Sequence, residues 1–97
     1  MSYDYNRFIL EMRFIFTKHA IEKFDQLERL GWVVTKDKIR RTIKKPKWTG
    51  VSRHGQKTAM SLVDQKHIIR VVFNKEDDII KIITFHIARR GKYESTL

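Results

Sequence analysis

Residues 17–46 read TKHAIEKFDQLERLGWVVTKDKIRRTIKKP, and this segment predicts two short helices joined by a tight link. Thr17 and Thr35 each precede an amphipathic stretch, where a threonine hydroxyl can accept a hydrogen bond from an amide of the first helical turn. Gly31 is expected to end the first helix and Pro46 the second. The apolar stripe of the first helix comprises Ala20, Ile21, Phe24, Leu27 and Leu30.

Both helix starts also show the spacing of a hydrophobic staple, in which the residue before the cap packs on the helix. The pairs are Phe16 with Ile21, and Val34 with Ile39. The inward side of the second helix is expected to hold Ile39, Thr42 and Ile43, and its outward side Lys36, Arg40, Arg41, Lys44 and Lys45.

The sequence on either side of the two helices predicts strands. Glu11–Phe16 alternates between polar and apolar residues, which is typical of a short strand. Three further strands are expected at Lys57–Asp64, His67–Asn74 and Ile79–Ala88, joined by the hairpin-length links 65–66 and 75–78. The predicted fold is therefore one α+β domain over residues 1–97, with its core at about 12–94. It has a short N-terminal strand, two helices and an antiparallel three-stranded meander.

These turn lengths predict a register in which Met60 lies opposite Val71 and Phe73 opposite Ile80. This register sorts the side chains of the meander onto two faces. The face toward the helices would hold Met60, Leu62, Ile69, Val71, Phe73, Ile80 and Ile82. The other face would hold Ser61, Arg70, Val72, Lys81, Ile83, Phe85 and Arg89. Three cations on such a face could stabilise the charge of phosphodiester cleavage, which needs no metal if a 2′-hydroxyl attacks and the substrate is RNA. Alternatively, these cations are solvated residues on a sheet with one covered face.

The positive charge of the chain is concentrated in one window. The chain carries +10 overall, and residues 36–57 contain nine Lys and Arg against one acid, Asp37. Such a window indicates a polyanionic partner, and we expect nucleic acid rather than anionic lipid because no broad exposed apolar stripe accompanies it. The predicted nucleic-acid-binding residues are Arg40, Arg41, Lys44, Lys45, Lys47, Trp48, Arg53, His54, Lys81 and Arg90.

Composition excludes several other classes of protein. The chain has no cysteine, which excludes disulfides and thiolate metal sites. No apolar run approaches the roughly 18 residues of a membrane span, and residues 1–8 lack the features of a signal peptide. We expect a soluble cytoplasmic protein with no membrane partner and no cofactor.

Histidines and aromatic residues supply the remaining candidates for chemistry. In the predicted register His67 opposes both His86 and Asp64, a group that could transfer protons, hold a metal or simply form a polar rim. His19 by itself is a surface histidine. Trp48 could stack on an unpaired base or cover the end of the second helix. Tyr93, among the cations of the C-terminal segment, could stack on a base or act as an acid.

The order of these motifs resembles the toxins of type II toxin–antitoxin systems, specifically the BrnT-like branch of the RelE/ParE superfamily and its uncharacterised close relatives. The matching segments are Thr17–Ala20, Val34–Asp37, Lys45–Pro46, Arg70–Phe73, Ile82–Arg90 and Tyr93. The chain departs from the pattern at His86, where these toxins usually have Arg, and at Ala20, where Gly is common.

The resemblance implies a small sheet preceded by two helices, acting as a metal-independent endoribonuclease that cleaves mRNA. An acidic antitoxin would cover its active face. The implied catalytic residues are Arg70 and Arg89 for the phosphate, His86 and Tyr93 for proton transfer or base stacking, and His19 by resemblance alone. Two alternatives remain: a non-catalytic nucleic-acid-binding module of the same fold, and a toxin that inhibits a protein, as in the ParE branch, whose target is DNA gyrase.

Overall fold

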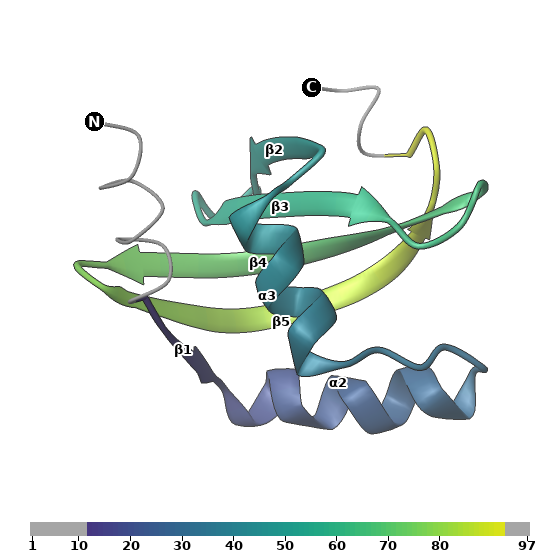
Figure 1. Ribbon diagram of the computed structural model, residues 1–97, viewed down its shortest axis with the longest axis horizontal. Coiled ribbons are helices and arrows are strands. Elements are labelled where there is room, and N and C mark those ends of the chain that lie inside the picture. Colours follow the sequence, from purple (N-terminus) through teal and green to yellow (C-terminus); the bar gives the residue numbers. More distant parts are fainter. Residues whose placement is uncertain (1–11, 93–97) are drawn as a thin grey trace.

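The strands of the protein form one mixed sheet in the order β1-β5-β4-β3-β2. This computed structural model describes residues 12–92, and within them it contains two helices and five strands (Figure 1). The elements are β1 (Arg13–Phe16), α2 (Lys18–Arg29), α3 (Lys36–Lys44), β2 (Trp48–Val51), β3 (Lys57–Leu62), β4 (His67–Glu76) and β5 (Ile79–Arg89). The α+β class and the order of the two helices agree with the sequence prediction.

Both helices begin and end where their capping residues predict. The hydroxyl oxygens of Thr17 and Thr35 accept hydrogen bonds from the amides of Ala20 and Lys38, each at 3.1 Å. Gly31, at φ +92°, closes α2 with the two backbone hydrogen bonds of a Schellman motif.

The apolar sides of the helices agree only in part with the prediction. On α2, Ala20 and Leu27 are buried and Phe24 packs against the core, whereas Ile21 is 43% exposed and Leu30 is more exposed still. The staple predicted between Phe16 and Ile21 therefore buries little apolar surface. On α3 the inward residues are as predicted, with Ile39 and Thr42 buried and Ile43 packed on the core.

The predicted three-stranded meander and the predicted N-terminal strand are present, and one further strand, β2, extends the sheet. β1 lies parallel to β5, with Phe14 beside Ile80, and it adds the first edge of the sheet. β2 pairs antiparallel with β3, with Trp48 opposite Met60. The sequence predicted no strand between Pro46 and Lys57, because a strand of four residues that includes Gly50 shows almost no periodicity. No helix in residues 12–92 has the length and apolar character needed to cross a membrane.

The predicted register of the first hairpin is wrong by one residue. Met60 lies opposite Arg70, where Val71 was expected. The cause is the β3–β4 turn, where the Val63 amide donates to the His67 carbonyl at 2.9 Å, so that residues 64–66 separate the paired ends instead of the two residues predicted. Within this Asx turn the carboxylate of Asp64 accepts a hydrogen bond from the Lys66 amide at 2.7 Å. The one-residue change of register moves every side chain of β3 to the other face.

The second hairpin also differs from the prediction, for two reasons. Its turn has only two residues, Asp77 and Asp78, with Asp77 at φ +53°, so Phe73 lies opposite Ile82 and not Ile80. A β-bulge then adds Ile83 as an extra residue of β5. The bulge turns Phe85 to the helix side, where it is fully buried, although the predicted register placed it on the opposite face.

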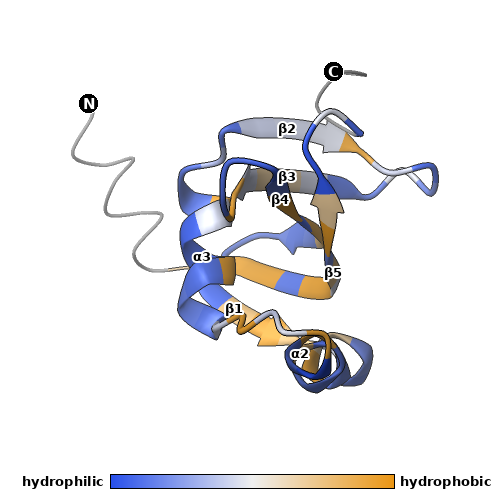
Figure 2. Cartoon of the chain, turned by 90° about the vertical axis from the view of Figure 1, so that its right-hand side faces the viewer, coloured by the Kyte–Doolittle hydropathy of each residue, from blue (hydrophilic) through white to orange (hydrophobic). Residues whose placement is uncertain are grey.

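The two faces of the sheet carry separate apolar clusters. The larger cluster lies between the sheet and the helices and includes Ala20, Ile39, Ile69, Val71 and Phe85. Figure 2, turned by 90°, shows α3 on one side of the strands and no helix of residues 12–92 on the other. On that other side, here called the outer face, Trp48 and Leu62 pack on a smaller cluster of Met60, Ile68 and Ala88.

Candidate nucleic-acid interface

The register places Trp48, Met60, Arg70 and His86 in one row across the outer face. Trp48 of β2 pairs with Met60 of β3, Met60 with Arg70 of β4, and Arg70 with His86 of β5. Directly paired residues of an antiparallel sheet point to the same face. Arg70 and His86 are therefore neighbours, although they lie 16 positions apart in the sequence.

Residues of the β2–β3 loop lie across from this pair and complete a pocket of about 490 Å³, here called the Arg70 pocket. The loop is held by Ser52, whose amide donates to the Gln56 carbonyl at 2.7 Å and whose hydroxyl accepts from the Gln56 amide at 3.1 Å. The pocket is lined by Ser52, Arg53, His54, Gln56, Arg70, Val72, Thr84 and His86. Two arginines and two histidines thus surround one cavity.

The imidazole of His86 is the most strongly perturbed titratable group of the Arg70 pocket. Burial lowers its pKa from 6.5 to about 4, and the positive charges of Arg70, Lys23 and Lys92 act in the same direction. At neutral pH the ring is therefore uncharged. A neutral imidazole beside a guanidinium can accept a proton while the arginine binds an anion.

A second pocket, of about 470 Å³, adjoins Trp48 and is here called the Trp48 pocket. Its lining comprises Trp48, Gln65, Lys66, Arg89, Arg90 and Gly91. The side chains of Lys47 and Arg90 lie over the indole ring, at 5.3 and 6.0 Å from its centroid. The Trp48 ring packs on the cluster of the outer face, so it neither covers the end of α3 nor projects fully into solvent.

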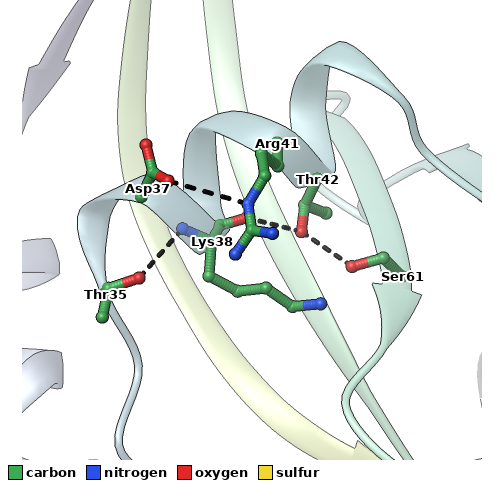
Figure 3. Close-up of polar contacts among 6 residues, drawn as sticks. All are labelled: Thr35, Asp37, Lys38, Arg41, Thr42 and Ser61. Atoms are coloured by element: carbon green, nitrogen blue, oxygen red, sulfur yellow. Dashed lines mark hydrogen bonds and ion pairs between the residues drawn. The ribbon is translucent and has the colours of Figure 1, made fainter.

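A third basic site lies on the helix side of the sheet, between α3 and β3. This α3 groove, of about 450 Å³, is lined by Lys38, Arg41, Thr42, Lys44, Lys45 and Ser61. Figure 3 shows the hydroxyls of Thr42 and Ser61 in contact, at 2.7 Å, with Lys38 and Arg41 beside them. Burial and the charge of Arg41 lower the pKa of Lys38, whose ammonium donates to the Leu62 carbonyl at 2.9 Å.

The structure separates the three cations that were predicted to share one sheet face. Arg70 lines the Arg70 pocket, whereas Arg89 pairs with His67 and lines the Trp48 pocket. Lys81 lies opposite Asn74, near the other end of β4 and β5. The single phosphate-binding face expected from the sequence is therefore replaced by separate sites.

The predicted Asp64-His67-His86 group is only half formed. The Asp64 carboxylate contacts Nδ1 of His67 at 3.0 Å, but His86 lies opposite Arg70 and not opposite His67. The Lys66 amide lowers the pKa of Asp64, and His67 packs against Trp32 at 4.7 Å between ring centroids. Among residues 12–92, no three His, Asp or Glu side chains are grouped so that they could hold a metal ion.

The other predicted residues lie on the surface or outside the described range. His19 is exposed on α2, and Tyr93 lies outside the residues that the structure describes. On α3, Arg40 and Lys44 stand over the ring of Phe14, at 6.0 and 5.9 Å from its centroid. Arg41 forms an exposed ion pair with Asp37 at 3.8 Å. The α3 cations are therefore on the opposite side of the sheet from Arg70 and His86.

Among the residues of these sites that sequence reasoning missed are Lys38, Thr42, Gln65 and Lys66. Lys38 and Thr42 share one side of α3 because they lie four residues apart, a spacing that could have indicated the groove. Gln65 and Lys66 were assigned to a turn, and no local signal places them beside Trp48.

Comparison with protein-family models, curated proteins and solved structures found no match for this chain.

Proposed function

We propose that this protein is a toxin-type endoribonuclease that cleaves mRNA without a metal ion and is neutralised by an acidic antitoxin. The observation that carries the proposal is the direct pairing of Arg70 with His86 in a pocket that also contains Arg53 and His54. A guanidinium suits a phosphate, and a neutral imidazole beside it suits proton transfer.

Each group in the Arg70 pocket has a role in this reaction. His86 takes the proton of a ribose 2′-hydroxyl, whose oxygen attacks the adjacent phosphorus in line. Arg70 and Arg53 stabilise the negative charge that develops on the phosphoryl oxygens. The bond to the 5′-oxygen breaks, and His54, which lines the same pocket, donates a proton to that oxygen. The products are a 2′,3′-cyclic phosphate and a 5′-hydroxyl.

The fold and the charge distribution give coarser support. Two helices precede the main strands of a small sheet, as the resemblance to BrnT-like toxins implies. The net charge of +10 favours association with a polyanion. With His86 in place of the arginine usual in those toxins, this chain would place a histidine beside Arg70 on the sheet.

The test is cleavage of a single-stranded RNA by the purified protein in excess EDTA. Arg70→Ala and His86→Ala are each expected to reduce the rate by about 10²-fold or more. Lys81→Ala, an exposed cation on the same face but away from the pocket, serves as the matched control and should cleave normally. On the acid side, the rate of the wild type should fall near pH 4, where His86 takes up a proton.

Two other results would identify the alternative functions. Intact RNA together with salt-sensitive binding would contradict cleavage and indicate a non-catalytic nucleic-acid-binding module. Arrest of growth on expression, without RNA cleavage or binding, would indicate a toxin that inhibits a protein. Relief of growth arrest by a co-expressed acidic protein from the same operon would support the antitoxin part of the proposal.

A further inference from the structure

The walls of the Trp48 pocket are held in place by backbone hydrogen bonds. The Arg90 amide donates to the Lys66 carbonyl at 2.8 Å, and this bond ties the segment after β5 to the β3–β4 turn. On the other side, the Lys47 amide donates to the Met60 carbonyl at 2.9 Å and positions the start of β2. The pocket is therefore already formed without a ligand.

The indole ring of Trp48 is itself held in a defined orientation. It packs against Met60, Ile68 and Ala88, all of which are buried. A ring supported in this way loses little conformational entropy when a flat partner stacks on it. Lys47 and Arg90 over the ring add positive charge beside it.

The register connects this ring to the Arg70 pocket. Trp48, Met60 and Arg70 occupy consecutive strands of one row, so Trp48 stands about 10 Å along the sheet from Arg70, at roughly 4.8 Å per strand. That span corresponds to about three nucleotides of a stacked strand, at roughly 3.4 Å each. One short stretch of RNA can therefore reach both positions.

We propose that the Trp48 pocket is a subsite for an unpaired nucleobase of the same RNA whose phosphate lies against Arg70. The inference rests on the proposed function for the identity of the substrate. The base stacks on the indole of Trp48, its polar edge faces the amide of Gln65, and Lys66 and Arg89 hold the flanking phosphates. The subsite selects single-stranded over duplex RNA, because a paired base has no exposed face to offer the ring.

The combination of an aromatic ring with cations favours a nucleotide over an acidic peptide. Lys66, Arg89 and Arg90 alone would satisfy carboxylates, and the tryptophan would then contribute little. A nucleotide uses both features, because its base supplies a flat π surface and its phosphate a negative charge.

The test measures binding of a DNA tetranucleotide, which has no 2′-hydroxyl and cannot be cleaved by the proposed reaction. Its partner ligand is a chain of the same length and charge in which tetrahydrofuran replaces every nucleoside. Trp32→Phe leaves Trp48 as the only tryptophan and so as the fluorescent reporter. The tetranucleotide should quench Trp48 and bind at least about fivefold more tightly than the base-free chain, the lower limit for stacking of one base.

The outcomes separate this inference from the proposed function. Equal affinities for the two ligands, or unchanged Trp48 emission, would overturn the subsite even if the protein cleaves RNA. Quenching and the affinity difference in a protein that leaves RNA intact would support the subsite while the ribonuclease proposal fails. Trp48→Leu should abolish the affinity difference. If that variant does not fold, the affinities of the unmodified protein for the two ligands still test the subsite.

Discussion

The Arg70 pocket and the α3 groove are both rich in cations, yet burial has opposite consequences in them. In the groove the desolvated group is Lys38, whose ordinary pKa of 10.5 lies far above neutrality. In the pocket it is His86, whose pKa falls from 6.5 to about 4. The same physical cause therefore keeps His86 uncharged at neutral pH, while Arg41, Lys44 and Lys45 line the groove with cations. A lining that contains a neutral base suits proton transfer, whereas a lining whose charged side chains are all cations suits retention of anions.

The largest expected effect is a difference between the two sites in catalysis. His86→Gln should lower kcat for RNA cleavage by about 10²–10⁴-fold, because the proton acceptor is lost. The double variant Lys44→Ala/Lys45→Ala should raise KM and leave kcat near the wild-type value, because those cations contribute only binding. Steady-state kinetics on one RNA measures both parameters. An equal loss of kcat in both variants would mean that the two sites are not distinct.

The next effect concerns stability in acid. The unfolded chain protonates His86 near pH 6.5 and the folded protein only near pH 4, so the free energy of unfolding should fall as the pH drops through this window. We expect a loss of about 2 kcal/mol, which discounts the full shift because the ring is partly exposed.

Urea titrations at several pH values should show this pH dependence of the unfolding free energy in the wild type and not in His86→Gln. The pKa of Lys38 is lowered from an ordinary value of 10.5, and that of Asp64 from 3.8, so both ordinary values lie outside the window between pH 4 and 6.5. Neither group obscures the window of interest. A slope of the same size in His86→Gln would assign the effect to another group.

A smaller effect is expected from the hydroxyl pair that joins α3 to β3. Thr42, 1% exposed, donates to the Lys38 carbonyl at 2.8 Å and contacts the Ser61 hydroxyl. Thr42→Val keeps the shape of the side chain but removes the hydroxyl that contacts the Lys38 carbonyl and the Ser61 hydroxyl. This change should cost about 1–2 kcal/mol of unfolding free energy. Ser61→Ala leaves the bond to Lys38 in place and should cost less. A larger loss in Ser61→Ala than in Thr42→Val would mean that the Ser61 hydroxyl makes an interaction more important than its contact with Thr42.

The smallest effect is on the salt dependence of RNA binding. Lys45→Ala in the groove and Arg53→Ala beside the pocket should each reduce the slope of log affinity against log salt by about 0.7, the value for one phosphate contact on a single strand. Lys18→Ala, an exposed cation at the start of α2, should leave the slope unchanged. A change with Arg53→Ala alone would place the RNA entirely on the outer face.

The features that could be predicted from the sequence depend on local interactions. Thr17 and Thr35 cap helices because each bonds to an amide three residues away, and Gly31 ends α2 through its own backbone angle. Arg70 and His86 were recognised as candidates by residue type and by resemblance. Their pairing was not predicted, because the two-residue turn at Asp77 and Asp78 and the bulge at Ile83 both changed the register of β5 against β4.

Thr17 shows how local and distant interactions meet in one residue. Its hydroxyl oxygen accepts from the Ala20 amide, as the cap predicts, and its hydroxyl also donates to the Ile83 carbonyl at 2.9 Å. The second bond joins the start of α2 to the bulge that turns Phe85 inward. Only the first bond could be read from the sequence, since the second links positions 66 residues apart.

The sequence by itself determined the two helices, the α+β class and the concentration of positive charge in residues 36–57, because caps, periodicity and composition are local properties. The tertiary structure alone decided which cations share a pocket. In a sheet that choice depends on register, and a one-residue change moves a side chain to the opposite face. The charged window therefore became the α3 groove and the loop of Arg53. The candidate chemistry lies across the sheet from the α3 groove, where the loop of Arg53 adjoins the pair of Arg70 and His86.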